Sequence, residues 1–152
     1  MSVLDSIKEK AKADVKHILL PEGSEERTVQ AARIITDEKI AKVTLLGDEE
    51  EIKKVAEKFN VCLCGIDIIN PLTDPDFEHY ANGFYELRKA KGMTPEKARE
   101  TIKNTLFYAC MMIKEGKADG MVSGAINTTG NTLRPVLQII KMSKGINTIS
   151  SC

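Results

Sequence analysis

The sequence predicts an α/β fold of three layers (α/β/α), with a mostly parallel sheet between two layers of helices. Short apolar runs alternate with stretches of helical periodicity along the 152 residues. Hydrophobic residues make up 42% of the chain, which is enough to fill the core of one compact domain. Short apolar strands that alternate with helices are typical of a parallel sheet covered on both faces.

The first half of the chain predicts a surface helix followed by strand–helix units. Ser2 is expected to cap the first helix. Val3, Leu4 and Ile7 form one apolar face of this helix, and we expect that face to pack on the domain. Asp48 and the carboxylate three residues later resemble a capping box. In order, we expect a helix at 2–14, a strand at 17–20, a helix at 26–38, a strand at 42–46, a helix after Asp48 and a strand at 66–70.

The second half predicts longer helices and two more extended segments. Thr94, Pro95 and Glu96 combine a capping hydroxyl, a proline in the first turn and a carboxylate near the positive helix end. We therefore expect one helix from this start to about Lys114, ended by Gly116. The other expected elements are a helix at 77–87, a strand at 120–122, a helix that carries Leu133 and Ile140, and an extended run at 146–150.

The charge balance argues against a polyanionic partner. Lys plus Arg and Asp plus Glu both number 22, so we expect neither nucleic acid nor a membrane surface as a partner. The apolar runs are too short to span a bilayer, and the amino terminus lacks the apolar core of a secretory signal. The expected location is the cytoplasm.

The cysteines and histidines give no sign of a metal site. Four cysteines, at positions 62, 64, 110 and 152, are expected to be thiols, because the chain shows no export signal. Cys62 and Cys64 have a spacing that suits neither zinc nor a redox pair, and no second pair follows. His17 and His79 are expected to be structural or solvated.

The strongest local candidate for a site is the segment from Met121 to Pro135. A strand end opens into a loop with glycines, hydroxyls and amides, and the next helix begins within the same dozen residues. Free backbone N–H groups and a positive helix end would suit a phosphate, and Arg134 could add a bidentate cationic donor. Small polar residues also build ordinary turns and N-caps, so an anion site and plain loop chemistry both stay open.

Two other charged clusters have simpler interpretations. Residues 88–93 (RKAKGM) put three cations and a glycine at a helix end, where cations complement the dipole and Gly92 can form the C-cap. This structural role is favoured over phosphate binding. Residues 21–27 (PEGSEER) place carboxylates at a helix start, where they are usually dipole partners rather than a paired-carboxylate active site.

Taken together, several segments resemble the phosphate acetyltransferase family. They are LPEG at 20–23 through Arg27, LRKAKGM at 87–93, ADGMVSGA at 118–125 and TLRPVLQIIK at 132–141, in matching order and spacing. The resemblance covers essentially all of the chain after its first helix. Residues 1–152 would then be a partial domain, the amino-terminal domain of a two-domain acyltransferase.

The resemblance implies reversible acetyl transfer between acetyl-CoA and inorganic phosphate, giving acetyl phosphate and CoA, with no metal or other cofactor. It also implies a homodimer in the full-length form and an active site in a cleft between two domains. By the same resemblance, Arg88 and Arg134 match basic residues associated with the phosphates of CoA. Ser123, Thr128 and Thr129 match the loop that lines the cleft.

The resemblance leaves the catalytic residues unassigned, because the family's acid–base and oxyanion groups lie near a carboxyl terminus that has no counterpart in this sequence. Ala90, Asn127 and Asn131 also depart from residues frequent in relatives. We therefore expect this chain to be inactive alone. The alternatives are a phosphate butyryltransferase or other acyl variant, and a non-catalytic CoA-binding fragment. The end of the sequence in an expected strand, at 147–152, suggests a chain that continues in its full-length form.

Overall fold

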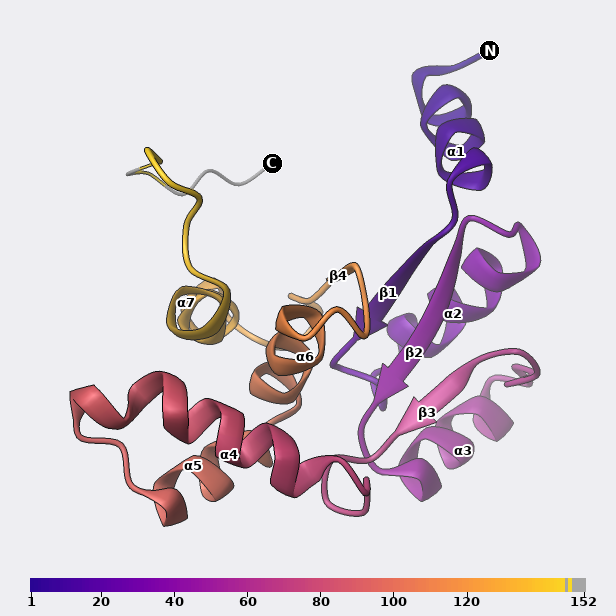
Figure 1. The fold of residues 1–152 in the computed structure, drawn as a ribbon. Helices are drawn as coiled ribbons and strands as arrows, with labels where there is room; N and C mark the ends of the chain where they lie inside the picture. The colour runs from indigo at the N-terminus through magenta and orange to yellow at the C-terminus, as the bar shows by residue number, and fades with distance from the viewer. Residues whose placement is uncertain (147, 149–152) are drawn as a thin grey trace.

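The computed structural model of the chain describes residues 1–146 and 148 (Figure 1). Within these residues, four strands form one parallel sheet in the order β3-β2-β1-β4. The strands are β1 (Lys16–Leu20), β2 (Ala41–Leu46), β3 (Asp67–Ile69) and β4 (Gly120–Met121). Ile18 of β1 is in register with Val43 on one side and Gly120 on the other. The predicted parallel sheet is therefore confirmed, and β1 lies inside it.

Helices cover both faces of the sheet, which confirms the three-layer arrangement. One face carries α2 (Glu26–Asp37) and α3 (Glu49–Lys58), and the other carries α4 (Phe77–Arg88), α5 (Pro95–Ile102) and α6 (Thr105–Lys114) (Figure 1). Successive strand residues point to opposite faces. Leu20 and Leu45 accordingly pack with α2 and α3, whereas Leu19 and Leu46 pack in the cluster that includes α4 and α6.

The predicted helix starts are confirmed by their capping contacts. The Asp48 side chain accepts a hydrogen bond from the Glu51 backbone N–H at 3.0 Å, and Thr94 accepts one from the Lys97 N–H at 3.3 Å. Such caps satisfy backbone donors that the first helical turn leaves unpaired. Gly92 follows a 3-10 turn at Lys89–Lys91 and adopts the left-handed conformation (φ 83°), as the C-cap prediction required.

The expected single helix from Pro95 to Lys114 is wrong, because the chain breaks into α5 and α6 at Asn104. Asn104 has an extended backbone (φ −71°, ψ 126°), and its side chain accepts a hydrogen bond from the Leu106 N–H at 2.9 Å. The Thr105 hydroxyl donates to the Pro21 carbonyl at 2.6 Å. Asparagine competes with helical backbone pairing by this kind of local contact, so a second N-cap replaced the continuous helix.

The first helix forms as predicted but does not pack as predicted. Helix α1 (Val3–Ala13) begins with a capping box between Ser2 and Asp5, yet the described part of the chain buries none of its residues. Leu4 is 61% exposed, and the helix projects away from the sheet (Figure 1). Lys8 forms an ion pair with Glu38 at 2.7 Å. The apolar periodicity of the helix indicated one apolar face, but periodicity contains no information about which surface covers that face.

The expectation of four thiols is wrong for one pair of cysteines. Cys62 and Cys64 form a disulfide in the loop between α3 and β3, with Cα atoms 5.4 Å apart, a separation that disulfides ordinarily span. Arg33 donates to the carbonyls of both residues, at 3.1 and 2.7 Å, and so fixes the turn that brings them together. Burial raises the pKa of the Cys110 thiol to about 12, and Cys152 lies outside the described residues.

The remaining expectations concern the histidines and the end of the chain. His17 is structural, as predicted, with its ring nitrogens 3.0 Å from the Lys117 carbonyl and 2.8 Å from the Thr44 hydroxyl. The candidate segment folds into α7 (Thr129–Pro135) followed by a π-helical stretch at Val136–Ile140. Three of the five residues of the extended run expected at 146–150 lie outside the described residues. None of the helices in the described part of the chain is both long and apolar enough to cross a membrane.

Candidate functional site

The candidate loop lies where two neighbouring parallel strands end. Strand β1 ends at Leu20 and β4 ends at Met121, and the two strands are paired in the sheet. Because parallel strands end at the same edge, Glu22 after β1 and Ser123 after β4 are brought together. The carboxyl edge of such a sheet is the usual place for a ligand site in open α/β folds.

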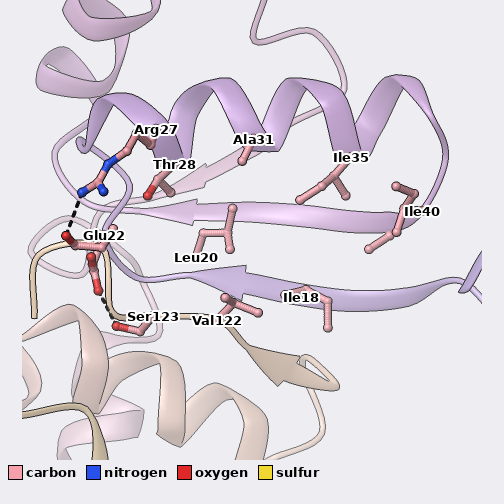
Figure 2. A pocket seen from close by; sticks show the side chains of 12 residues that line it. Ile18, Leu20, Glu22, Arg27, Thr28, Ala31, Ile35, Ile40, Val122 and Ser123 are labelled. Atoms are coloured by element: carbon pink, nitrogen blue, oxygen red, sulfur yellow. Dashed lines mark hydrogen bonds between the residues drawn. The ribbon is translucent and has the colours of Figure 1, made fainter. Parts of the chain in front are cut away.

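Glu22 is the centre of the contacts in this loop. Its Oε1 accepts hydrogen bonds from the Ser123 hydroxyl at 2.5 Å and from the Gly124 backbone N–H at 2.6 Å. Its Oε2 accepts one from the Ile126 N–H, also at 2.6 Å. Figure 2 shows Glu22 and Ser123 facing each other. Glu22 is only 5% exposed, so the loop encloses a buried carboxylate.

The environment of Glu22 keeps it ionised. Burial raises the pKa of its carboxyl group, but the hydrogen bonds from Ser123, Gly124 and Ile126 lower it, and the net shift is downward. A carboxylate with a lowered pKa and occupied acceptor sites is a weak base. The contact between Glu22 and Ser123 is therefore not a nucleophile–base pair, for which the base must readily accept the serine proton.

Gly23 explains why the Glu22 side chain faces the loop. The Gly23 backbone N–H donates to the Leu46 carbonyl at the end of β2, at 3.0 Å. A Cβ atom on residue 23 would lie 2.5 Å from that oxygen, closer than side chains approach backbone atoms. Glycine is thus required for the chain after β1 to lie against β2, which fixes Glu22 opposite residues 123–126.

Arg27 ties the same loop to the start of α2. Its Nη2 donates to the Ala125 carbonyl at 2.8 Å, and its Nε donates to Glu25 at 2.7 Å. Glu25 is also the N-cap of α2, accepting from the Thr28 N–H at 2.9 Å. The prediction that acidic residues serve the helix start is therefore confirmed for Glu25 and wrong for Glu22, which binds the distant loop instead.

An apolar cavity opens beside the loop, between α2 and the strands. It has a volume of about 430 Å³, and Figure 2 shows it bounded by α2 above and by β1 and β4 below. Its polar end is formed by Glu22, Arg27, Thr28 and Ser123. Its remaining walls are aliphatic, with Ile18, Leu20, Ala31, Ile35, Ile40 and Val122 among the lining residues.

The structure places four of the five predicted site residues on one continuous segment. Ser123 is half-buried against Glu22, and the Thr128 hydroxyl caps α7 by accepting from the Asn131 N–H at 3.2 Å. Thr129 is the first residue of α7 and Arg134 is its next-to-last residue, and both are exposed. The loop donors that could have bound a phosphate are thus paired with the chain's own Glu22 carboxylate.

Arg88 lies on a different element, at the end of α4. That helix packs against the π-helical stretch after α7, through a core that includes Phe84 and Ile139. The Nε atom of Arg88 is buried and has no hydrogen-bond partner among the residues that the structure describes. A buried guanidinium N–H without an acceptor is unfavourable, and an anionic ligand could satisfy it.

Glu22 is the site residue that sequence reasoning missed. Its partners are more than 100 positions away, and no local pattern pairs a carboxylate after one strand with a serine after another. The available signal was the combination of both segments at strand ends, since the carboxyl ends of parallel strands meet at one edge.

Comparisons with known proteins identify the family of this chain. A family model described as phosphate acetyl/butaryl transferase matches residues 2–152. Phosphate acetyltransferases from Thermoanaerobacterium thermosaccharolyticum and Acetivibrio thermocellus are 51% and 53% identical over 99% of this chain, and each match spans 45% of the relative. The chain thus spans just under half the length of these relatives.

Solved structures show the same fold. A phosphotransacetylase from Streptococcus pyogenes superposes with a TM-score of 0.90 at 37% identity, covering 97% of this chain and 46% of that one. A EutD phosphotransacetylase from Staphylococcus aureus gives 0.87 at 38% identity, covering 95% and 44%. With a family model that matches nearly every residue, the chain belongs to the phosphate acetyl/butaryl transferase family.

Proposed function

We propose that this chain provides one wall of a phosphate acetyltransferase site, which transfers acetyl groups reversibly between acetyl-CoA and inorganic phosphate. The observation that carries the proposal is the identity of 51% and 53% to phosphate acetyltransferases across 99% of the chain. Relatives with this name favour acetyl transfer over the butyryl alternative and over a non-catalytic CoA-binding fragment.

The part proposed for this chain is recognition of CoA. Arg88 and Arg134 are proposed to bind its phosphates, because arginine offers a permanent charge and a fork of donors. The exposure of Arg134 supports this role, as does the buried Nε of Arg88, which has no hydrogen-bond partner among the described residues. Thr128 and Thr129 are proposed to line the site, and Ser123 to form its floor, because the Ser123 proton is already donated to Glu22.

Several features of the whole protein remain proposals. We propose a reaction without a metal or prosthetic group, a homodimer in the full-length form and a cytoplasmic location. Support comes from the resemblance and from a balanced charge that favours neither nucleic acid nor a membrane surface. No residue of this chain is proposed as catalytic, because the acid–base and oxyanion groups that the resemblance implies have no counterpart in this sequence.

Calorimetric titration of the chain with CoA tests the proposal. We expect measurable binding that weakens as salt rises, because exposed charge contacts are screened. Pantetheine, which lacks the phosphates of CoA, is the matched control ligand and should bind more weakly. Equal affinity for the two ligands would contradict recognition of the phosphates.

A further inference from the structure

We propose that Glu22 is a positioning residue, an internal anion whose carboxylate holds residues 123–126 so that Thr128, Thr129 and Arg134 are presented in a fixed place. The inference rests on the proposed function, since it concerns the CoA-binding segment. It assigns no contact with the ligand to Glu22 itself. The Glu22 carboxylate and its three donors are called the Glu22 clamp below.

The first step of the argument is that the donors of the loop are already occupied. The N–H groups of Gly124 and Ile126 and the Ser123 hydroxyl converge on one carboxylate within 2.5 to 2.6 Å. Converging donors of this kind are what a loop uses to bind a phosphate. A phosphate could use these donors only by displacing a buried carboxylate. We therefore assign ligand contacts to the residues after the loop, which are Thr128, Thr129 and Arg134.

The second step is that the clamp is fixed to the rigid part of the fold. On one side of Glu22, the Pro21 carbonyl accepts from the Thr105 hydroxyl at the start of α6, at 2.6 Å. On the other side, the Gly23 N–H donates to the Leu46 carbonyl of β2, at 3.0 Å. A site is held precisely when the residues that support it are themselves held by packed elements.

The third step is that the clamp acts on the proposed ligand segment over a short distance along the chain. Ile126 is two residues before Thr128, which caps α7, and Arg134 belongs to α7. Downstream, Ile139 is fully buried in the core. The segment with the proposed ligand residues is therefore anchored by the clamp at one end and by the core at the other.

The test compares Glu22→Gln with Ile102→Val in the same chain. Glutamine keeps the size of the side chain but replaces one acceptor oxygen with an NH2 donor. This donor would face a donor of the loop, either a backbone N–H or the Ser123 hydroxyl, and one hydrogen bond of the clamp would be lost. Ile102 is fully buried on α5, and its substitution lowers stability without changing a group of the clamp. Hydrogen exchange of the Gly124 and Ile126 amides and the affinity for CoA are measured in each.

For Glu22→Gln we expect exchange at both amides to accelerate, and CoA affinity to fall, by about tenfold or more each. Ile102→Val should leave the amides and the affinity unchanged at a temperature where both variants are folded. If Glu22 contributed only to general stability, Glu22→Gln would behave like Ile102→Val and keep both the slow exchange of the two amides and the CoA affinity, and that result would overturn the inference.

The remaining outcomes separate the two proposals. Faster exchange with unchanged CoA affinity overturns the positioning role and leaves the proposed function intact. No CoA binding by the unmodified chain overturns the proposed function, and the positioning role with it. If Glu22→Gln does not fold, Ser123→Ala removes one donor and is expected to weaken CoA binding to a smaller extent; unchanged affinity in that variant would overturn the inference.

Discussion

The β4–α7 loop and helix α1 are both short polar segments at the surface, but they are held in opposite ways. The loop is tied to the sheet by hydrogen bonds from residues about 100 positions away, including a carboxylate that is 5% exposed. Helix α1 has a complete local cap and leaves Val3 80% exposed. A local signal can therefore form an element, whereas its place in the fold depends on distant partners.

The largest expected effect concerns the catalytic activity of this chain by itself. We expect the purified chain to form acetyl-CoA from acetyl phosphate and CoA at a rate near background, because shared orientation by two walls can supply roughly 7–11 kcal/mol. The acid–base and oxyanion groups that the resemblance assigns to the other part of the relatives should account for further factors of about 100 each. A coupled assay beside one of the full-length relatives measures this, and turnover within about tenfold of that enzyme would place the active site in this chain.

Removing the clamp should cost more stability than removing the contact that holds α1. We expect Glu22→Ala to lower the free energy of unfolding by roughly 2–4 kcal/mol, because buried donors lose a charged acceptor. Lys8→Ala, which breaks the ion pair between α1 and Glu38, should cost less than about 1 kcal/mol. Urea denaturation of both variants makes the comparison, and equal losses would show that the two segments are held alike.

Loss of a proposed ligand contact should affect binding rather than folding. We expect Arg134→Ala to weaken CoA binding on the order of tenfold, and the loss should shrink as salt rises. Lys144, an exposed cation beyond α7, offers the matched control, and Lys144→Ala should leave CoA affinity close to that of the unmodified chain. Titration calorimetry checks both variants. An equal loss in the two would indicate general electrostatic attraction instead of a specific contact.

Acid should weaken the loop that Glu22 holds. The pKa of Glu22 is lowered in the folded chain, so its contribution to stability is present above the pKa of the unfolded state and is lost as pH falls through the lower folded value. Thermal melts between about pH 6 and pH 3 should therefore lose more stability in the unmodified chain than in Glu22→Gln. If the melting temperature fell equally with pH in the two proteins, Glu22 would not be the group responsible for the loss of stability.

The smallest expected effect lies in the exposed face of α1. Leu4→Ser together with Ile7→Ser should change the free energy of unfolding by no more than about 0.5 kcal/mol, because both side chains are more than half exposed. Denaturation of the double variant measures this. A loss of several kcal/mol would show that the apolar face packs against the domain after all, as the sequence had predicted.

The elements of this fold follow from local chemistry, and so they could be predicted. Asp48, Thr94 and Thr128 begin helices through contacts with N–H groups only three residues ahead. The break at Asn104 was missed because an apolar stripe on both sides of it looked continuous, although asparagine is itself a capping residue. The apolar periodicity of the neighbouring residues predicted one helix, whereas the side chain of Asn104 sets the boundary in the structure.

The candidate site was predicted only in part, because its decisive contacts are not local. The segment of Ser123, Thr128, Thr129 and Arg134 was recognised from glycines, hydroxyls and a helix start. The carboxylate that fills its loop was not, because Glu22 meets Ser123 only after β1 and β4 have paired. The Cys62–Cys64 disulfide was missed for a different reason, because the absence of an export signal led us to expect thiols.

The close approach of Gly23 to β2 has a consequence for reading mutational scans of this family member. A methyl group at position 23 would lie 2.5 Å from the Leu46 carbonyl oxygen, so Gly23→Ala must push the turn after β1 away from β2. Glu22 would move with that turn and release a loop on the neighbouring strand. In a scan scored by ligand binding, Gly23 would then rank among the ligand contacts, although its neighbours are β2 and the Ile52 side chain. The loss of binding would report a strain passed on through the turn after β1, and not a contact with the ligand.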